Sequence, residues 1–346
     1  MEAPTEEQYQ KVSFMAFGDR STVARHPSIS IDLTNLGHLD SRFENVLAPA
    51  IREEAVGLTA QFTDNAETYA NAYASTPYFT WLIKRAVALA DLSQAPRDIL
   101  DIGAGAGDNS TFPAAEMWPE ASIIATDLSA QLLAILNREA KKREVSSRLT
   151  IVCVDAMNDI FEEQSFDLVM GSAILHHLIE PLDALKAAHR VLRPGGIAIF
   201  FEPFELGYSL VANVFDRISS ESALRNEPLS PEVISFMKNF VQDIKRRLGT
   251  DKSAPLYREI DDKWLFTRPY FTEAAAKIGF SDCLIEGIQE PKLQLSRYIK
   301  TFLRIGAKTT VDALPPWAQH LCEAADEMFV ESTREIITEA IVVMKK

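Results

Sequence analysis

Short apolar runs alternate with stretches of helical spacing through the middle of the chain. The runs are rich in Ile, Val, Leu and Phe, and most end at a polar or acidic residue. The predicted strands are 99–101, 122–127, 149–154, 166–173 and 197–201, and the helix-like segments between them include 109–118 and 182–192. Strands that alternate with helices are typical of an α/β protein with a parallel sheet.

The same pattern divides the 346 residues into four parts. The predicted parts are a helical N-terminal arm or cap at 1–90, an α/β core at 91–205, a helical lid at 206–265, and a completion of the core at 266–346 that contains a helical insertion at 290–337. Within the last part we expect a sixth strand at 281–287 and a final strand at 339–345. A chain of this length and 47% apolar composition can bury a sizeable core.

The most informative motif is the turn after the first strand. Asp101 ends that strand, and Gly103, Gly105 and Gly107 follow at alternating positions. Glycine lets the backbone approach a ligand closely and tolerates positive φ. A dinucleotide fingerprint would need its third glycine one place later, where Asp108 stands and would repel a phosphate. The turn therefore favours a nucleotide-like cofactor without phosphate.

This turn resembles motif I of the class I S-adenosylmethionine-dependent methyltransferases, and roughly residues 90–205 are similar to the small-molecule branch of that superfamily. The resemblance implies a Rossmann-like sheet of seven strands in the order 3-2-1-4-5-7-6, with the last strand antiparallel. It also implies S-adenosyl-L-methionine as the cofactor, whose sulfonium charge suits an acidic site.

Further cofactor-binding residues are expected at the ends of the next strands. Asp127 ends the second strand about 20 residues beyond the glycines, where an acidic ribose ligand belongs. Together with Asp101 and the three glycines, the expected set comprises Asp127, Leu128, Asp155, Ala156, Ser172, Tyr69 and Tyr73. The resemblance places Asp155 and Ala156 at the adenine edge. The two tyrosines would cover the methionine end, although their spacing of four is also typical of ordinary helix packing.

Candidate catalytic residues lie after the fourth and fifth strands. His176 and His177 follow the fourth, at the edge where open α/β sheets bind ligands, and imidazole suits proton transfer near neutral pH. Either histidine could instead anchor the loop. Glu202 follows the fifth strand and would orient an imidazole, hold the substrate, or simply start a helix.

A metal site is not expected. Metal-dependent relatives of the resembled superfamily carry an aspartate after the fourth strand and an Asp-Asn pair after the fifth. Here those places hold Ser172 and Glu202-Pro203, so we predict direct base catalysis or catalysis by proximity.

The net charge and the cysteine content bear on the binding partners and on the cellular location of the protein. A formal net charge of −14 disfavours a nucleic acid backbone, and the compact basic runs at 141–143 and 245–247 fit solvated faces or helix ends. The three cysteines show no paired spacing, and the sequence shows neither a leader nor an apolar stretch that could span a membrane. We therefore expect a soluble cytoplasmic protein. Apolar faces on the arm and the insertion suggest a homodimer, or they simply pack onto the core.

These observations favour methyl transfer to an oxygen, rather than a nitrogen or a carbon, of a hydrophobic small molecule such as a secondary metabolite. A second hypothesis is a methyltransferase fold that binds the cofactor for a non-methylating reaction or for regulation, since fold does not fix function. A third, a nicotinamide-dependent oxidoreductase, is disfavoured by the glycine spacing.

Overall fold

The structure is a computed structural model that describes most of the chain. The described residues are 36–39, 42–49, 58–73, 75–92, 94–158, 160–225, 227–288, 294–327 and 336–346, without the side chains of Tyr73 and Gln294. Parts of the predicted N-terminal arm and of the predicted 290–337 insertion therefore lie outside the described residues.

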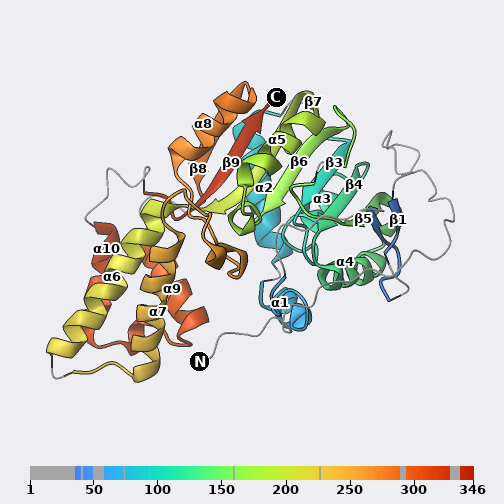
Figure 1. Cartoon of the computed structure of the whole chain (residues 1–346). Coiled ribbons are helices and arrows are strands. Elements are labelled where there is room, and N and C mark those ends of the chain that lie inside the picture. The colour runs from blue at the N-terminus through green and yellow to red at the C-terminus, as the bar shows by residue number, and fades with distance from the viewer. Residues whose placement is uncertain are drawn as a thin grey trace.

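The described strands form one mixed sheet through the centre of the molecule, in the order β1-β2-β5-β4-β3-β6-β7-β9-β8 (Figure 1). The strands are β1 (Leu36–His38), β2 (Val46–Pro49), β3 (Asp98–Ile102), β4 (Ser122–Asp127), β5 (Leu149–Cys153), β6 (Phe166–Ser172), β7 (Leu192–Pro203), β8 (Asp282–Gly287) and β9 (Glu339–Lys345). The strands from β2 to β7 pair in parallel, whereas β1 is antiparallel to β2 and β9 is antiparallel to both β7 and β8.

The expected number of seven strands is wrong, because β1 and β2 extend the sheet beyond β5. Counted along the chain from β3, the remaining strands stand as 3-2-1-4-5-7-6, with the last one antiparallel. The two extra strands have three and four residues. Such short runs carry no readable period, which is why this part of the arm was predicted to be helical.

Helices cover both faces of the sheet. On one face lie α2 (Thr76–Ala90), α3 (Thr111–Met117) and α4 (Ala130–Lys142), and on the other lie α5 (Pro181–Val191) and α8 (Arg268–Ile278). Successive strand residues serve opposite layers, so that Ile99 packs with α2 and α3 while Leu100 packs with α5 and α8. Strands buried on both faces are rich in apolar residues, and most residues of these strands are apolar.

Local signals fix several helix ends. The Ser129 side chain accepts a hydrogen bond from the Leu132 amide at the start of α4, and Thr267 does the same for the Tyr270 amide at the start of α8. Helix α8 ends at Gly279, whose φ of 105° is left-handed and favours glycine.

The remaining long helices form a helical unit beside the sheet, at the lower left of Figure 1. Its members are α6 (Glu205–Leu224), α7 (Pro231–Arg247), α9 (Gln294–Gly306) and α10 (Pro316–Glu327). They share one apolar core, in which the rings of Tyr208, Phe240 and Phe302 are in contact. The predicted lid and the predicted insertion thus build one unit. Separately from this unit, α1 (Ala66–Tyr73) packs on α4.

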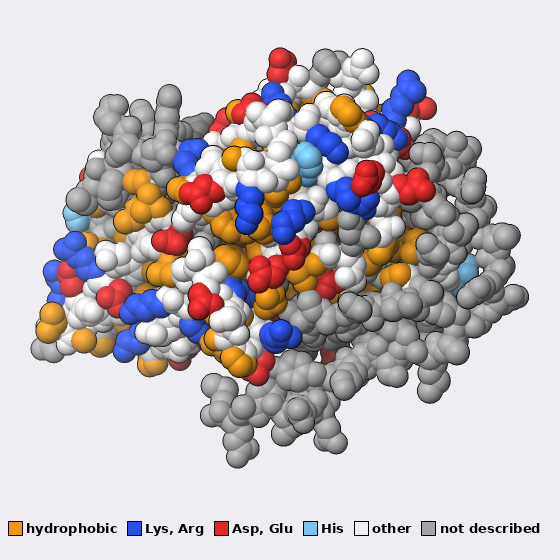
Figure 2. All heavy atoms as spheres, turned by 45° about the horizontal axis from the view of Figure 1, so that its top comes forward, with side chains coloured by type: hydrophobic (Ala, Val, Ile, Leu, Met, Phe, Trp, Pro, Cys, Tyr) orange, Lys and Arg blue, Asp and Glu red, His pale blue; other side chains and the backbone are white. Residues whose placement is uncertain are grey.

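The surface shows no sign of a polyanion-binding face in the view of Figure 2. Lys and Arg side chains lie among Asp and Glu side chains there, without a continuous basic patch. None of the helices that the structure describes has the length and apolar character needed to cross a membrane.

Replacing Phe215 by alanine should destabilise the helical unit. Phe215 on α6 is fully buried in the core of that unit, and truncating a buried phenylalanine costs about 3–5 kcal/mol of the free energy of unfolding. Leu224, on the same helix, is 86% exposed, so Leu224→Ala should change it by less than about 0.5 kcal/mol. Urea unfolding followed by circular dichroism measures both values, and equal effects would contradict the assignment of this core.

Candidate functional site

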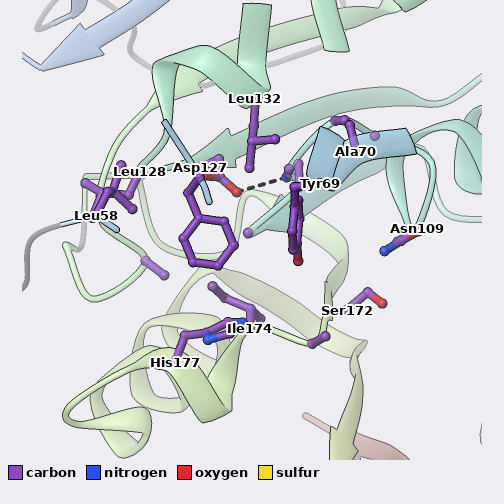
Figure 3. A pocket seen from close by; sticks show the side chains of 18 of the residues that line it. Leu58, Tyr69, Ala70, Asn109, Asp127, Leu128, Leu132, Ser172, Ile174 and His177 are labelled. Atoms are coloured by element: carbon purple, nitrogen blue, oxygen red, sulfur yellow. Dashed lines mark hydrogen bonds between the residues drawn. The ribbon is translucent and has the colours of Figure 1, made fainter. Parts of the chain in front are cut away.

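A cavity lies at the carboxyl ends of β3, β4, β5 and β6, the edge that the sequence predicts for the site. Its floor is the glycine turn after β3, and residues of the N-terminal arm, among them Leu58, Phe62 and Tyr69, close it from the other side. Figure 3 shows Asp127 on one side of the cavity, with Ile174 and His177 facing it from the other.

The glycine turn needs its glycines for two physical reasons. Gly103, Gly105 and Gly107 all have positive φ, of 68°, 53° and 93°. A Cβ at Gly103 would also stand 2.5 Å from Cγ1 of Ile174, and one at Gly107 would stand 2.7 Å from the Phe112 ring. Side chains at these positions would block the turn, so it keeps its backbone open to the cavity.

Asp127 is tied to this turn. Its Oδ2 accepts a hydrogen bond of 2.9 Å from the Gly105 amide, the dashed line in Figure 3, and its Oδ1 accepts one of 2.7 Å from the Ser129 amide. Burial raises the pKa of Asp127, and these backbone hydrogen bonds act in the opposite direction. Each carboxylate oxygen can accept a further hydrogen bond. Asp127 and Leu128 both line the cavity, as do Asp155 and Ala156 at the end of β5.

Asp101 has a different position from the expected one. Its side chain is completely buried and lies outside the cavity lining. Its Oδ2 accepts hydrogen bonds from the hydroxyls of Ser110 and Thr111, at the start of α3. Burial raises the pKa of Asp101 to about 7. Asp101 thus links the end of β3 to the start of α3, and its expected contact with the cofactor stays a prediction.

The two tyrosines of the arm are only partly described. Tyr69 lines the cavity, and its ring meets that of Phe62 edge-on, with 5.0 Å between the ring centroids. Tyr73 belongs to α1, but its side chain lies outside the described residues. Its expected contact with the cofactor stays a prediction.

The two adjacent histidines occupy different environments. His177 lines the cavity, and its Nδ1 lies 3.0 Å from the backbone carbonyl oxygen of Asp261. His176 is buried behind it, with Nδ1 2.7 Å from Oε2 of Glu202 and Nε2 3.4 Å from Oδ1 of Asp262. The ring centroids are 4.1 Å apart. Of the pair, His177 is the one that reaches the cavity.

Glu202 does not face the cavity, contrary to expectation. It is 1% exposed. Its Oε1 accepts hydrogen bonds from the amides of Ile174 and Leu175, at 3.0 and 2.8 Å, while Oε2 accepts from the amide and the ring of His176. The carboxylate therefore orients an imidazole, as one sequence hypothesis held, and it also fixes the turn after β6.

The charges around the two imidazoles shift their pKa values in opposite directions. Burial alone would lower the pKa of His176, but the carboxylates of Glu202 and Asp262 outweigh burial and raise it to about 9. Burial and the neighbouring His176 charge lower the pKa of His177 to about 3. These opposite shifts favour a proton on His176 over one on His177.

His176, His177 and Asp262 also place three possible metal-ligand atoms within 4.8 Å of one another. The ring nitrogens that would bind an ion already have partners within the protein, however. Both nitrogens of His176 face carboxylates, and Nδ1 of His177 needs its proton to donate to the Asp261 carbonyl. A metal ion would have to displace these protons, so the donor set fits an ion poorly, and the expectation of a metal-free site stays a prediction.

Comparison with known proteins identifies the core. Residues 100–200 match the family model described as a methyltransferase domain. The chain carries a class I S-adenosylmethionine-dependent methyltransferase domain. This match supports S-adenosylmethionine as the cofactor, as predicted.

Three relatives show how far the similarity extends. Malonyl-[acyl-carrier protein] O-methyltransferase from Marinomonas sp. is 35% identical over 34% of this chain and 42% of the relative. The C-methyltransferase UbiE of ubiquinone/menaquinone biosynthesis from Paracoccus denitrificans is 32% identical over 36% and 51%. The 27-O-demethylrifamycin SV methyltransferase from Amycolatopsis mediterranei is 27% identical over 57% and 65%. The chain thus spans about half the length of these relatives.

The cavity has polar atoms that suit the cofactor's amino acid end. Asn109 Oδ1 and Ser172 Oγ are buried and have no hydrogen-bond partner among the described residues. Both residues line the cavity and lie near each other in Figure 3. An α-ammonium group could donate to the Asn109 oxygen, and the Ser172 hydroxyl could donate to an α-carboxylate. Because unpaired buried polar atoms are costly, these two atoms indicate a polar ligand.

Some site residues were not predicted from the sequence. Asn109 is the second residue after Gly107, so its position near the glycine turn could have drawn attention to it. Leu58 and Phe62 come from the arm, and Asp261 and Asp262 come from the predicted lid. These four lie far in sequence from the core strands, and no local spacing relates them to the cavity.

Asp127→Ala should weaken the binding of S-adenosylmethionine by about 10- to 100-fold, because hydrogen bonds to a charged group contribute about 1.5–3 kcal/mol. Calorimetric titration measures the affinity. Asp167→Ala is the matched control, since Asp167 also accepts backbone hydrogen bonds, from Arg97 and Asp98, but at the amino end of β6. Equal affinities of wild type and the Asp127 variant would show that the ribose contact is absent.

Proposed function

We propose that this protein is a methyltransferase that transfers the methyl group of S-adenosylmethionine to an oxygen of a hydrophobic small molecule. The carrying observation is the cavity itself. Unpaired polar atoms of Asn109 and Ser172 lie at one end, and an imidazole, His177, lies in a wall that is otherwise apolar. Pockets of this kind, apolar with few placed polar groups, suit small organic ligands.

When bound, S-adenosylmethionine supplies an electrophilic methyl group on a sulfonium. His177 is placed to handle the proton of a hydroxyl acceptor. Since its Nδ1–H is donated to the Asp261 carbonyl, the lone pair of Nε2 is free for the acceptor. An alkylated oxygen is a far stronger acid than an imidazolium, so even a weakly basic Nε2 can take its proton as the C–O bond forms and the C–S bond breaks.

Several side chains support an apolar acceptor. Leu58, Phe62 and Leu178 line the cavity around His177, and the Phe62 and His177 rings meet edge-on with 5.6 Å between centroids. Such walls exclude water and hold an apolar molecule in place, and holding two reactants in line supplies much of the barrier reduction. The relatives' names include both O- and C-methyltransferases, so they do not favour one acceptor atom. The choice of oxygen is therefore based on His177 as a base for a hydroxyl proton. A homodimer and a cytoplasmic location stay predictions.

The direct test is incubation of the protein with S-adenosylmethionine carrying a labelled methyl group. A panel of apolar phenols, alcohols, carboxylic acids and carbon nucleophiles should yield labelled ethers or esters, identified by mass spectrometry. Cofactor binding without transfer to any panel member would contradict the proposal and favour a non-methylating role for the fold. Transfer to carbon alone would contradict the choice of oxygen.

His177→Ala should lower kcat by about 100-fold or more, while S-adenosylmethionine affinity changes little, because positioned proton transfer contributes about 10²–10⁴-fold. Steady-state kinetics and calorimetry separate the two effects. His189→Ala is the control: His189 lies on α5, where its ring packs on Phe280, and its loss should leave kcat as in the wild type. If His177→Ala retained full kcat, proximity alone would account for catalysis.

A further inference from the structure

The last residues of the predicted lid contribute two acidic residues to the histidine pair. The Asp261 carbonyl oxygen lies 3.0 Å from Nδ1 of His177. Oδ1 of Asp262 lies 3.4 Å from Nε2 of His176 and 3.4 Å from Nδ1 of His177. The backbone amide of Lys263 donates a hydrogen bond of 2.8 Å to the His176 carbonyl. This segment is therefore fastened directly onto the turn that carries both histidines.

Asp262 is itself held by the helical unit. Its Oδ2 lies 3.2 Å from Nη1 of Arg247, in the last turn of α7. Arg247 is only 4% exposed. Its Nη2 donates to the Trp264 carbonyl, and its guanidinium lies over the ring of Tyr208. A guanidinium held on several sides fixes the carboxylate that it contacts. Arg247 thus lies at a helix end, one of the two roles expected for 245–247, but it is buried instead of solvated.

We propose that Asp262 is a positioning residue that keeps the histidine pair in one arrangement, with His176 charged between Glu202 and Asp262 and His177 neutral toward the cavity. This inference rests on the proposed function for its catalytic meaning. The effect on protonation does not depend on that function. Asp262 lies outside the matched methyltransferase domain, and it influences the protonation of two histidines inside that domain.

The charged groups around the pair support this arrangement. His176 faces the carboxylates of Glu202 and Asp262, with that of Glu339 farther away. Two imidazoles with centroids 4.1 Å apart, one buried and one partly buried, repel each other when both are charged. The two close carboxylates lie on either side of His176, so the proton resides there.

His177 faces the His176 charge and the Lys263 ammonium, both of which disfavour a second proton, and Asp262, which favours one. Its burial also disfavours the charged form. In turn, the two histidines and Arg247 hold the pKa of Asp262 well below its usual range, although burial acts the other way. The carboxylate is therefore ionised whenever the pair is in this state.

Removing the Asp262 charge should reduce the difference between the pKa values of His176 and His177. In Asp262→Asn, His176 loses one of its two close carboxylates, and its pKa should fall by about 1–3 units. A weaker charge on His176 repels a proton on His177 less, so the pKa of His177 should rise unless the lost attraction of Asp262 cancels this gain. The fall at His176 is the decisive quantity.

The protonation states can be measured directly in protein labelled with ¹⁵N-histidine, by long-range ¹H–¹⁵N correlation spectra over pH 5–10. In the wild type at pH 7 we expect one imidazolium, His176, and one neutral ring protonated on Nδ1, His177. Two neutral rings, or a charge on His177, would overturn the proposal without any variant. The spectra need no acceptor, so they remain decisive even if methyl transfer is never found.

Asp261→Asn is the matched control for Asp262→Asn. Asp261 is the neighbouring residue, and its contact with His177 is made by the backbone carbonyl, which the variant keeps. Its side chain instead accepts from Thr59 and Gln61 of the arm. The control should leave both histidine pKa values in place, and Asp262→Glu should restore the His176 charge. An unchanged His176 in Asp262→Asn, or an equal shift in Asp261→Asn, would overturn the proposal.

Discussion

The carboxylate of Glu202 connects the end of β7 to the turn that carries both histidines, and the rest of the site depends on this connection. It lies at the end of β7 with almost no exposure to solvent, and it accepts backbone hydrogen bonds from the turn after β6 as well as one from the ring of His176. Burying a carboxylate costs several kcal/mol, and each hydrogen bond to a charged group returns about 1.5–3 kcal/mol. The carboxylate is therefore tolerable only with its full set of donors, which leaves the turn little freedom.

That turn places Ile174, and Ile174 fills space on two sides. A Cβ at Gly103 would lie 2.5 Å from its Cγ1, and a Cβ at Gly171 would lie 2.7 Å from its Cγ2. The glycine turn that lines the cavity and the turn that carries the histidines are thus packed on one isoleucine side chain. A shift of either turn would be felt by the other, because buried side chains are close-packed. The two sides of the cavity are therefore packed together as one assembly.

The sequence predicted the parts of this assembly that depend on local pattern. Strands buried on both faces read as apolar runs, and glycines at alternating positions mark a turn with positive φ, so β3 to β7 and the cavity edge could be predicted. The contacts of Asp101 and the link between Glu202 and the turn after β6 could not, since each depends on which buried donors surround the carboxylate. Glu202 bonds to amides 26 to 28 residues away, and no spacing rule connects β7 with that turn. Asp261, Asp262 and Arg247 are farther still from the histidines that they affect.

The position of these residues along the chain bears on how one domain serves different acceptors. The matched methyltransferase domain, 100–200, includes both histidines, whereas Glu202 lies just beyond it and Arg247 and Asp262 belong to later segments. Part of the charge that divides the histidines therefore comes from outside the domain. Long segments outside a core diverge more freely than the core itself. A relative that keeps both histidines but lacks Asp262 and its arginine partner would hold the same pair in another protonation state, and with it a different preference for the proton of the acceptor.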